Sequence, residues 1–217
     1  MSRPSTPLPA DMLHVGLTGG IGAGKSSVSE GFRERGAHIL DADQLARELT
    51  VPGSEALAEI IEAFGRNVLD DEGGLCRGRL AERVFADAGE RQRLDAILHP
   101  RINALEKDRT AVIGAHNPHA LVIYEAPLLL ESGADRQVER ILVVDLPEEL
   151  QVERAIARGN RSADQVRAIM ASQCSRRERL RRAHDVIDNS GPWQATARQI
   201  DALMAHYRTL AANGYPS

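Results

Sequence analysis

The sequence predicts an α/β fold built on a parallel β-sheet of five strands. Five short apolar segments have the length and composition of strands: 14–18, 37–41, 121–125, 141–145 and 185–187. The middle ones are unbroken runs of Val, Ile and Leu, which is typical of strands that helices cover on both faces. Patterns with helical periodicity lie between these segments, and strands that alternate with helices form parallel sheets.

The connections between the strands differ greatly in length. A helix predicted over 25–35 joins the first two strands and ends before Gly36. The next connection runs from Ala42 to about Ala120 and holds further helical patterns, at 54–64, 79–85, 90–98 and 100–113. Because crossovers of this length are uncommon, we expect a binding lobe; an appendage that only adds stability is the alternative. Residues 150–182 are also predicted to be helical, and they are rich in arginine.

The bulk composition excludes several classes of protein. The 217 residues fit one domain with insertions, and the net charge of −4 argues against a nucleic-acid-binding surface. The two cysteines, Cys76 and Cys174, lack metal-ligand spacing and are expected to be reduced thiols. No signal peptide and no apolar run of about 18 residues is present, so we expect a soluble, cytoplasmic protein without a membrane partner. A monomer is the expectation for its assembly, and an oligomer is the alternative. Residues 1–13 are predicted to be a flexible tail.

The segment after the first predicted strand carries the most specific motif. Gly19 to Ser26 match the phosphate-binding pattern G-x-x-x-x-G-K-[ST], between a strand and a helix. Its backbone amides and the helix N-terminus are suited to nucleotide phosphates. Lys25 is predicted to reach the β- and γ-phosphates of ATP, Ser26 to bind Mg²⁺, and Ser27 to reach the α-phosphate. The other residues predicted to bind ATP here are Gly20, Ile21, Gly22, Ala23 and Gly24.

Carboxylates follow two of the predicted strands. Asp41 and Asp43 lie at the end of the second strand, where ligands of parallel sheets bind. If this segment is extended, the two side chains point the same way, so that one can accept a proton while the other assists Mg²⁺. Asp43 could instead cap the next helix. Asp145 ends the fourth strand as a rival for the metal-linked acid, but the helix start that follows favours a structural or capping role.

The arginines between Arg154 and Arg182 allow two interpretations. A run of charge is usually a solvated helix face. Beside a phosphate-binding loop, however, phosphoryl transfer needs positive charge over the γ-phosphate. Arg154 and Arg158 are four residues apart and share one helix face, which ends at Gly159-Asn160. We therefore predict a lid over residues 150–182 that carries both arginines.

These motifs, in their order and spacing, make the chain resemble the dephospho-coenzyme A kinase family from about His14 to Tyr207. The matching pieces are Leu17–Ser26, Asp41-Ala42-Asp43, Asp71–Leu75 with Arg77, Leu98-His99-Pro100, Pro127–Glu131 and Val186–Gly191. The resemblance implies a P-loop kinase core (14–53, 117–149 and 183–217), a helical substrate lobe (54–116) and a helical lid (150–182). It implies ATP-dependent phosphorylation of the ribose 3′-hydroxyl of dephospho-CoA, the last step of coenzyme A synthesis.

The resemblance also implies roles for single residues. Asp43 is the expected general base and Arg158 the expected lid arginine, with Lys25 as the third catalytic residue. Arg154 and Asn189 are expected to contact ATP. The residues expected at the dephospho-CoA site are Asp41, Asp43, Arg77, His99, Pro127 and Leu128.

The sequence can be compared with the requirements of three rival functions. A regulatory GTPase would need an Asn/Thr-Lys-x-Asp motif, but the lysines of the chain, Lys25 and Lys107, stand in other contexts. Another P-loop small-molecule kinase, for a nucleoside monophosphate or a sugar acid, fits the loop and the lid equally well. A non-catalytic nucleotide-binding module is the third, and an intact Asp43 argues against it.

Overall fold

The five strands coincide with the short apolar runs of the sequence. The computed structural model describes residues 12–159 and 162–213. Its strands are β1 (Leu13–Thr18), β2 (His38–Asp41), β3 (Leu121–Glu125), β4 (Arg140–Asp145) and β5 (Asp185–Asp188). Every residue of β1 and β3 is buried. The apolar residues of these strands therefore lie on both faces of the sheet, as expected when helices cover both faces.

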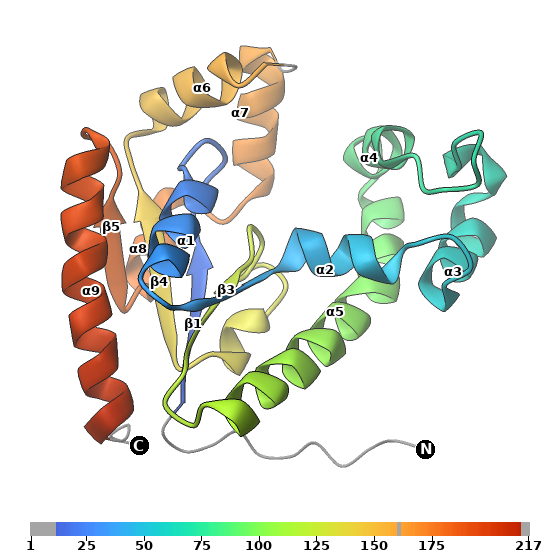
Figure 1. Ribbon diagram of the computed structural model, residues 1–217. Coiled ribbons are helices and arrows are strands. Elements are labelled where there is room, and N and C mark those ends of the chain that lie inside the picture. Colours follow the sequence, from blue (N-terminus) through green and yellow to red (C-terminus); the bar gives the residue numbers. More distant parts are fainter. Residues whose placement is uncertain (1–11, 160–161, 214–217) are drawn as a thin grey trace. The chain divides into compact units, whose positions relative to one another are not determined.

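The strands pair in the order β2-β3-β1-β4-β5, and every neighbouring pair is parallel. The predicted five-stranded parallel sheet is therefore confirmed (Figure 1). Strand β1 lies at the centre, between β3 and β4. Because parallel strands end at the same edge of a sheet, the loop after β1 lies beside the ends of β3 and β4.

Two helices that are distant in sequence pack together against the sheet. Helix α1 (Lys25–Glu34) contacts α9 (Trp193–Asn213), and both contact β1 and β3. Their buried apolar side chains form the core with the strands; Phe32 and Tyr207 stack in it with ring centroids 6.2 Å apart. This packing fixes the position at which α1 begins, directly after the glycine-rich loop.

The arginine-rich segment is three helices and not one. They are α6 (Glu148–Ala157), α7 (Ala163–Ser172) and α8 (Arg176–Arg182). After α6, Gly159 has a φ of 80°, and Ser162 then starts α7 with a complete capping box. Ser175 caps α8 in the same way, because its side chain accepts the N–H of Glu178. The segment predicted to be helical at 150–182 is thus divided by these serine caps, and its first helix ends just before Gly159, where the sequence predicted a helix end.

The long insertion contains α2 (Ala42–Leu49), α3 (Glu55–Phe64), the 3₁₀ turn η1 (Arg66–Val68), α4 (Arg77–Ala86) and α5 (Ala88–His116). Helix α5 spans the two segments predicted as separate helices, with Pro100 inside it. A proline removes one helical hydrogen bond, to the carbonyl four residues before it. Apolar contacts of Leu94, Ile97 and Leu98 with a small core around Ile60 hold the helix together before that point.

The described chain divides into two compact units. Residues 42–109 form one, with the small core of Ile60, Phe64, Val68 and Leu80, and the remaining residues form the other around the sheet. The compact unit of the insertion thus includes α2, which lies outside the predicted lobe at 54–116. Strand β1 begins at Leu13, inside the predicted tail, whose residues 1–11 lie outside the described chain.

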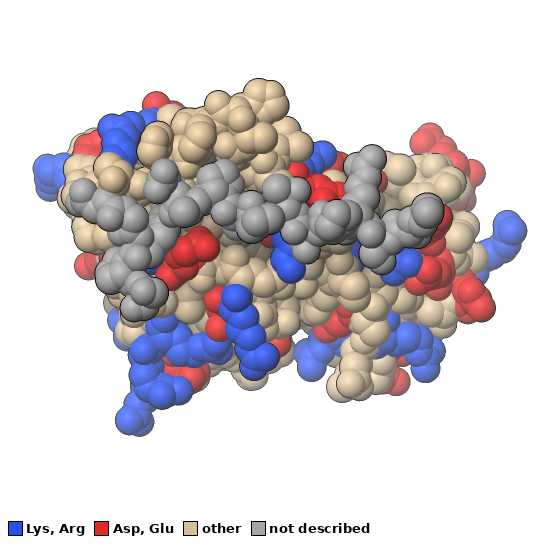
Figure 2. Space-filling model, turned by 90° about the horizontal axis from the view of Figure 1, so that it is seen from below, with Lys and Arg blue, Asp and Glu red and all other residues tan. Residues whose placement is uncertain are grey.

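Charged side chains of both signs lie on the surface (Figure 2). Figure 2 shows acidic and basic side chains interspersed among uncharged ones on one face of the molecule. Across the described residues, no helix has both the length and the apolar character required to cross a bilayer.

Candidate active site

The loop between β1 and α1 has the backbone geometry that its glycines predict. Gly22 and Gly24 have φ values of 75° and 86°, in the left-handed region that favours glycine. A Cβ on Gly22 would also lie 2.3 Å from the carbonyl oxygen of Gln151, so a side chain there would collide with α6. Helix α1 begins at Lys25, and the N-terminal end of a helix is a favourable position for a phosphate group.

Lys25 and the two serines after it lie at the first turn of α1. The Nζ of Lys25 donates to the carbonyl oxygens of Gly19 and Gly20, at 3.0 and 3.2 Å, so the ammonium group lies against the loop. Ser26 and Ser27 are exposed. A cationic group, backbone amides at a helix N-terminus and an exposed hydroxyl are the components that hold a nucleotide's phosphates and its magnesium ion.

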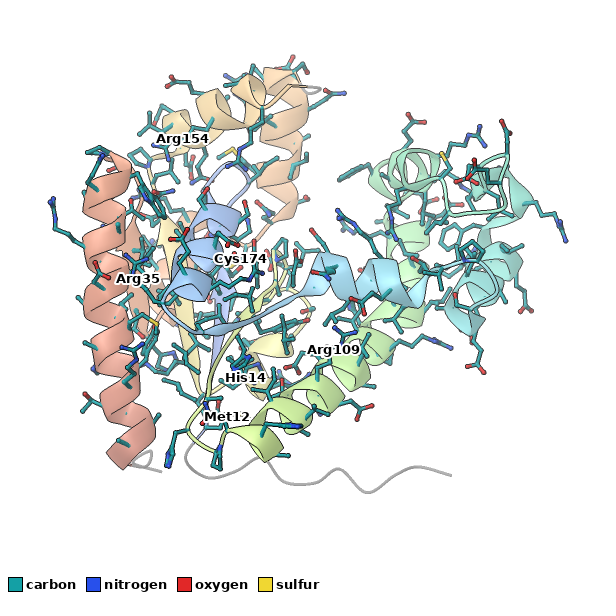
Figure 3. The ribbon with its side chains drawn as sticks, viewed as in Figure 1. Met12, His14, Arg35, Arg109, Arg154 and Cys174 are labelled. Carbon is teal, nitrogen blue, oxygen red and sulfur yellow. The ribbon has the colours of Figure 1, made fainter. Side chains whose placement is uncertain are left out.

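Hydrogen bonds from the turn after β5 also hold the glycine-rich loop. Asn189 follows β5, is buried, and donates from Nδ2 to the carbonyl oxygen of Ala23 at 2.8 Å. Its Oδ1 accepts the hydroxyl of Thr196 at 2.8 Å. Arg154 points from α6 towards the same turn and donates to the carbonyl oxygen of Asn189 at 2.7 Å (Figure 3). Arg154 and Asn189, both predicted to contact ATP, are thus brought together beside the loop.

A side chain of the predicted lid segment also contacts the loop. Gln173, between α7 and α8, accepts the backbone N–H of Ile21 at 3.1 Å through its Oε1. These residues are 152 positions apart in the sequence. The contact places the start of α8 directly beside the glycine-rich loop.

The carboxyl ends of β2 and β3 carry a pair of acids in register. Asp41 of β2 lies opposite Glu125 of β3. Glu125 is buried, and it accepts a hydrogen bond of 2.5 Å from the hydroxyl of Ser29, one turn after Ser26. Oxygen donors of this kind suit Mg²⁺, which is usually bound by one or two carboxylates together with substrate phosphates. No group of three or more His, Cys, Asp or Glu side chains in the described chain is arranged to hold a metal ion.

With this geometry in view, comparison with known proteins decides the family. A family model described as dephospho-CoA kinase matches residues 13–194. The dephospho-CoA kinase of Cupriavidus pinatubonensis is 47% identical over 204 residues, which cover 94% of this chain and 98% of that protein. The chain belongs to the dephospho-CoA kinase family.

Solved structures agree with that assignment. A dephospho-CoA kinase from Campylobacter jejuni matches with a TM-score of 0.68 and 25% identity, over 91% of this chain and 98% of that one. A shikimate kinase from Acinetobacter baumannii matches with a TM-score of 0.52 and 18% identity, over 93% and 95% of the two chains. The second likeness shows the shared α/β kinase fold alone.

Asp145 has a structural role in this dephospho-CoA kinase family member. Its two carboxylate oxygens accept hydrogen bonds of 2.9 and 2.7 Å from Nε and Nη2 of Arg176 on α8. The N-cap of α6 is Pro147, so of the two roles expected of Asp145, structural or helix-capping, its contacts fit the structural one. The carboxylate holds α8 against the end of β4.

The arginines of the lid segment differ in their surroundings. Arg158 is the C-cap residue of α6 and is exposed, whereas Arg154 is half-buried on the turn before it. Asn160, part of the predicted lid turn, lies outside the described residues. Arg181 is exposed and pairs with Glu178 one turn away, as expected of a solvated helix face. The arginine run therefore combines a residue held beside the glycine-rich loop, Arg154, with exposed residues.

Asp43 and Arg77 belong to the insertion unit. Asp43 is the second residue of α2, so the extended conformation assumed for Asp41–Asp43 is wrong: the strand ends at Asp41 and the helix begins at once. Arg77 begins α4 and donates from Nη2 to the hydroxyl of Thr50 at 2.7 Å. Burial lowers the pKa of Arg77, Arg47 lowers it further, and the charge of Asp43 opposes both effects.

The remaining predicted substrate residues are distributed over both units. His99 of α5 lies 3.4 Å from the carboxylate of Asp95 one turn earlier. Pro127 and Leu128 follow β3 in the sheet unit, where the carbonyl of Pro127 accepts the hydroxyl of Thr18 at 3.4 Å and Leu128 is 41% exposed.

Sequence reasoning missed Glu125, although a signal for it was present. Leu-Val-Ile-Tyr-Glu (121–125) has the same pattern of four apolar residues and an acid that drew attention to Asp145. Strand order decides between the two acids: Glu125 contacts α1 through Ser29, whereas Asp145 is held by Arg176. The strand order was not readable from either segment.

Proposed function

We propose that this protein transfers the γ-phosphate of ATP to the ribose 3′-hydroxyl of dephospho-CoA, giving coenzyme A and ADP. The observation that carries the proposal is the dephospho-CoA kinase match over residues 13–194, which includes the whole glycine-rich loop with Lys25 already against it. In this reaction the hydroxyl oxygen forms a bond to the γ-phosphorus, and the bond from that phosphorus to the β–γ bridging oxygen breaks. ADP leaves with the electron pair.

The residues at the loop supply binding and positive charge. The amides of 20–24 and the N-terminus of α1 hold the phosphates, and the Lys25 ammonium exchanges its backbone carbonyls for phosphate oxygens. Ser26 binds Mg²⁺, with help from Asp41 or Asp43; when bound, the ion neutralises charge on the phosphate oxygens. The buried Glu125 beside Asp41 adds a negative group that favours a cation at this edge.

The acceptor side of the reaction is assigned to the insertion. Asp43 accepts the proton of the 3′-hydroxyl as general base, which requires an approach of about 2.6–3.2 Å in the complex. Arg77 and Arg47 give the same unit positive charge near Asp43, which suits an acceptor that carries phosphate groups. His99, Pro127 and Leu128 complete the proposed dephospho-CoA site, and the helices at 42–109 form its lobe.

The lid arginines complete the nucleotide side. Arg158, exposed at the end of α6, supplies positive charge over the γ-phosphate in the complex, and Arg154 with Asn189 borders the adenine. We place the protein in the cytoplasm as a monomer.

A coupled assay of ADP release tests the proposal. The purified protein is given ATP and Mg²⁺ with dephospho-CoA, shikimate, gluconate or a nucleoside monophosphate as acceptor. We expect the highest kcat/KM with dephospho-CoA, and product with a 3′-phosphate. Lys25→Ala serves as the control for contaminating kinases and should lose at least nine-tenths of the rate. A higher kcat/KM with any other acceptor would replace the proposed substrate.

A further inference from the structure

Arg179 is the buried arginine of a helix whose other arginines are exposed or paired with acids. Helix α8 reads Arg-Arg-Glu-Arg-Leu-Arg-Arg, and Arg179 is only 7% exposed. Arg176 pairs with Asp145, Arg181 with Glu178, and Arg182 with Asp135. Within the described chain, no carboxylate lies within ion-pair distance of the Arg179 guanidinium.

The guanidinium of Arg179 faces the glycine-rich loop. Its Nη1 donates to the carbonyl oxygen of Cys174 at the start of α8. Its Nη2 lies near Gly20, because a Cβ built on that glycine would be 3.0 Å from it; the Oε1 of Gln151 is closer, at 2.0 Å from the same Cβ position. The carbonyl oxygen of Gly20 also accepts the ammonium group of Lys25, at 3.2 Å. Two cationic side chains from distant parts of the chain therefore meet at one glycine of the loop.

A buried charge without a counter-charge is costly, and proteins normally pair it. A guanidinium presents a planar fork of N–H donors that suits phosphate oxygens better than any other side chain does. The contact with Cys174 uses one of these donors and supplies no negative charge. The N–H donors that Arg179 keeps near Gly20 and Gln151 can therefore bind an anionic oxygen of the nucleotide.

We propose that Arg179 is a phosphate-binding residue, which holds the triphosphate chain at Gly20 together with Lys25. The proposal rests on the proposed use of ATP. Two contacts position α8 for this purpose: Arg176 ties it to Asp145, and Gln173 binds the amide of Ile21. The helix thus brings its one inward-facing arginine to the loop in a fixed orientation.

The test compares Arg179→Met with Arg181→Met, a matched change on the exposed side of the same helix. Calorimetry measures binding of inorganic tripolyphosphate, and the ADP-release assay measures KM for ATP. We expect Arg179→Met to weaken tripolyphosphate binding and to raise KM for ATP, each by at least tenfold. Arg181→Met should leave both unchanged, and Arg179→Lys should recover part of the loss.

The melting temperature without ligand separates binding from a structural role. Removing an uncompensated buried charge should leave the Tm of Arg179→Met unchanged or raise it. Arg179 would be structural, and the proposal overturned, if Arg179→Met had a lower Tm or failed to fold while Arg179→Lys bound tripolyphosphate as the wild type does. Equal tripolyphosphate binding by the two Met variants would also overturn the proposal. Phosphorylation of a different acceptor by the wild-type protein would refute the proposed substrate and leave this result standing.

Discussion

Replacing Asn189 with alanine tests whether one buried side chain holds the glycine-rich loop in shape. The amide of Asn189 donates to the carbonyl of Ala23 and accepts the hydroxyl of Thr196, both at 2.8 Å. Each buried hydrogen bond contributes about 0.5–1.5 kcal/mol, and a carbonyl left unsatisfied costs about 1–3 kcal/mol. Asn189→Ala should therefore lower the unfolding free energy by about 2–4 kcal/mol. For a chain of this length that is a fall in Tm of roughly 5–15 °C.

The same change should weaken ATP binding, because the loop must then be ordered by the ligand. Fixing one backbone residue costs about 1–2 kcal/mol, which corresponds to about tenfold in Kd. Differential scanning fluorimetry and calorimetry with ATP measure the two effects. Thr196→Val is the companion variant: it removes one of the two bonds and leaves the Ala23 carbonyl satisfied, so ATP affinity should be unchanged. A Tm within about 1 °C of wild type for Asn189→Ala, or equal loss of ATP affinity in both variants, would refute the reasoning.

Three further outcomes follow from the site and the core. Asp43→Asn should bind ATP normally and transfer phosphate at least ~100-fold more slowly in single turnover. Asp145→Asn should keep the wild-type rate and lose about 1–3 kcal/mol of unfolding free energy, because its ion pair with Arg176 of α8 is weakened. The reverse pattern would assign the general base to Asp145 at the end of β4. Arg158→Ala should lower kcat while Arg181→Ala leaves it unchanged, and equal effects would show that no single lid arginine acts. Burial raises the pKa of Tyr207 above its usual value near 10, so its neutral form stabilises the fold below pH ~10 and this contribution is lost as the pH rises further. Urea unfolding at pH 9–11 should show a smaller loss of stability for Tyr207→Phe, and an identical slope would contradict this role.

The parts of the protein that were predictable from sequence are those in which a short segment determines its own structure. The glycine-rich loop needs backbone conformations that only glycine adopts readily, and Gly22 and Gly24 have them. The strands were predicted from their short apolar runs; β1 and β3 are buried throughout, whereas the edge strands β2 and β5 are partly exposed. Helix boundaries were less predictable. Pro100 suggested an interruption, but the apolar contacts of the insertion keep α5 continuous through it.

The side-chain contacts that complete the site were not predictable, because they join residues distant in the chain. Ser29 and Glu125 are separated by 96 positions, and their hydrogen bond exists because β3 lies next to β1. The difference between Asp145 and Glu125 depends on the same strand order. Arg179 was one arginine among several in a charged run; its burial comes from the direction in which α8 packs.

The short helix α8 has a consequence for how the sequence can vary. Its seven residues include five arginines, yet these side chains have different neighbours: an acid on β4, the glycine-rich loop, a glutamate one turn away and Asp135. A saturation-mutagenesis scan should therefore show tolerance that alternates with the helical period along α8. Moving an arginine by one position should be as harmful as deleting it, although the net charge stays the same. Arg176 and Asp145 should tolerate substitution best as a pair, since a charge swap restores their contact.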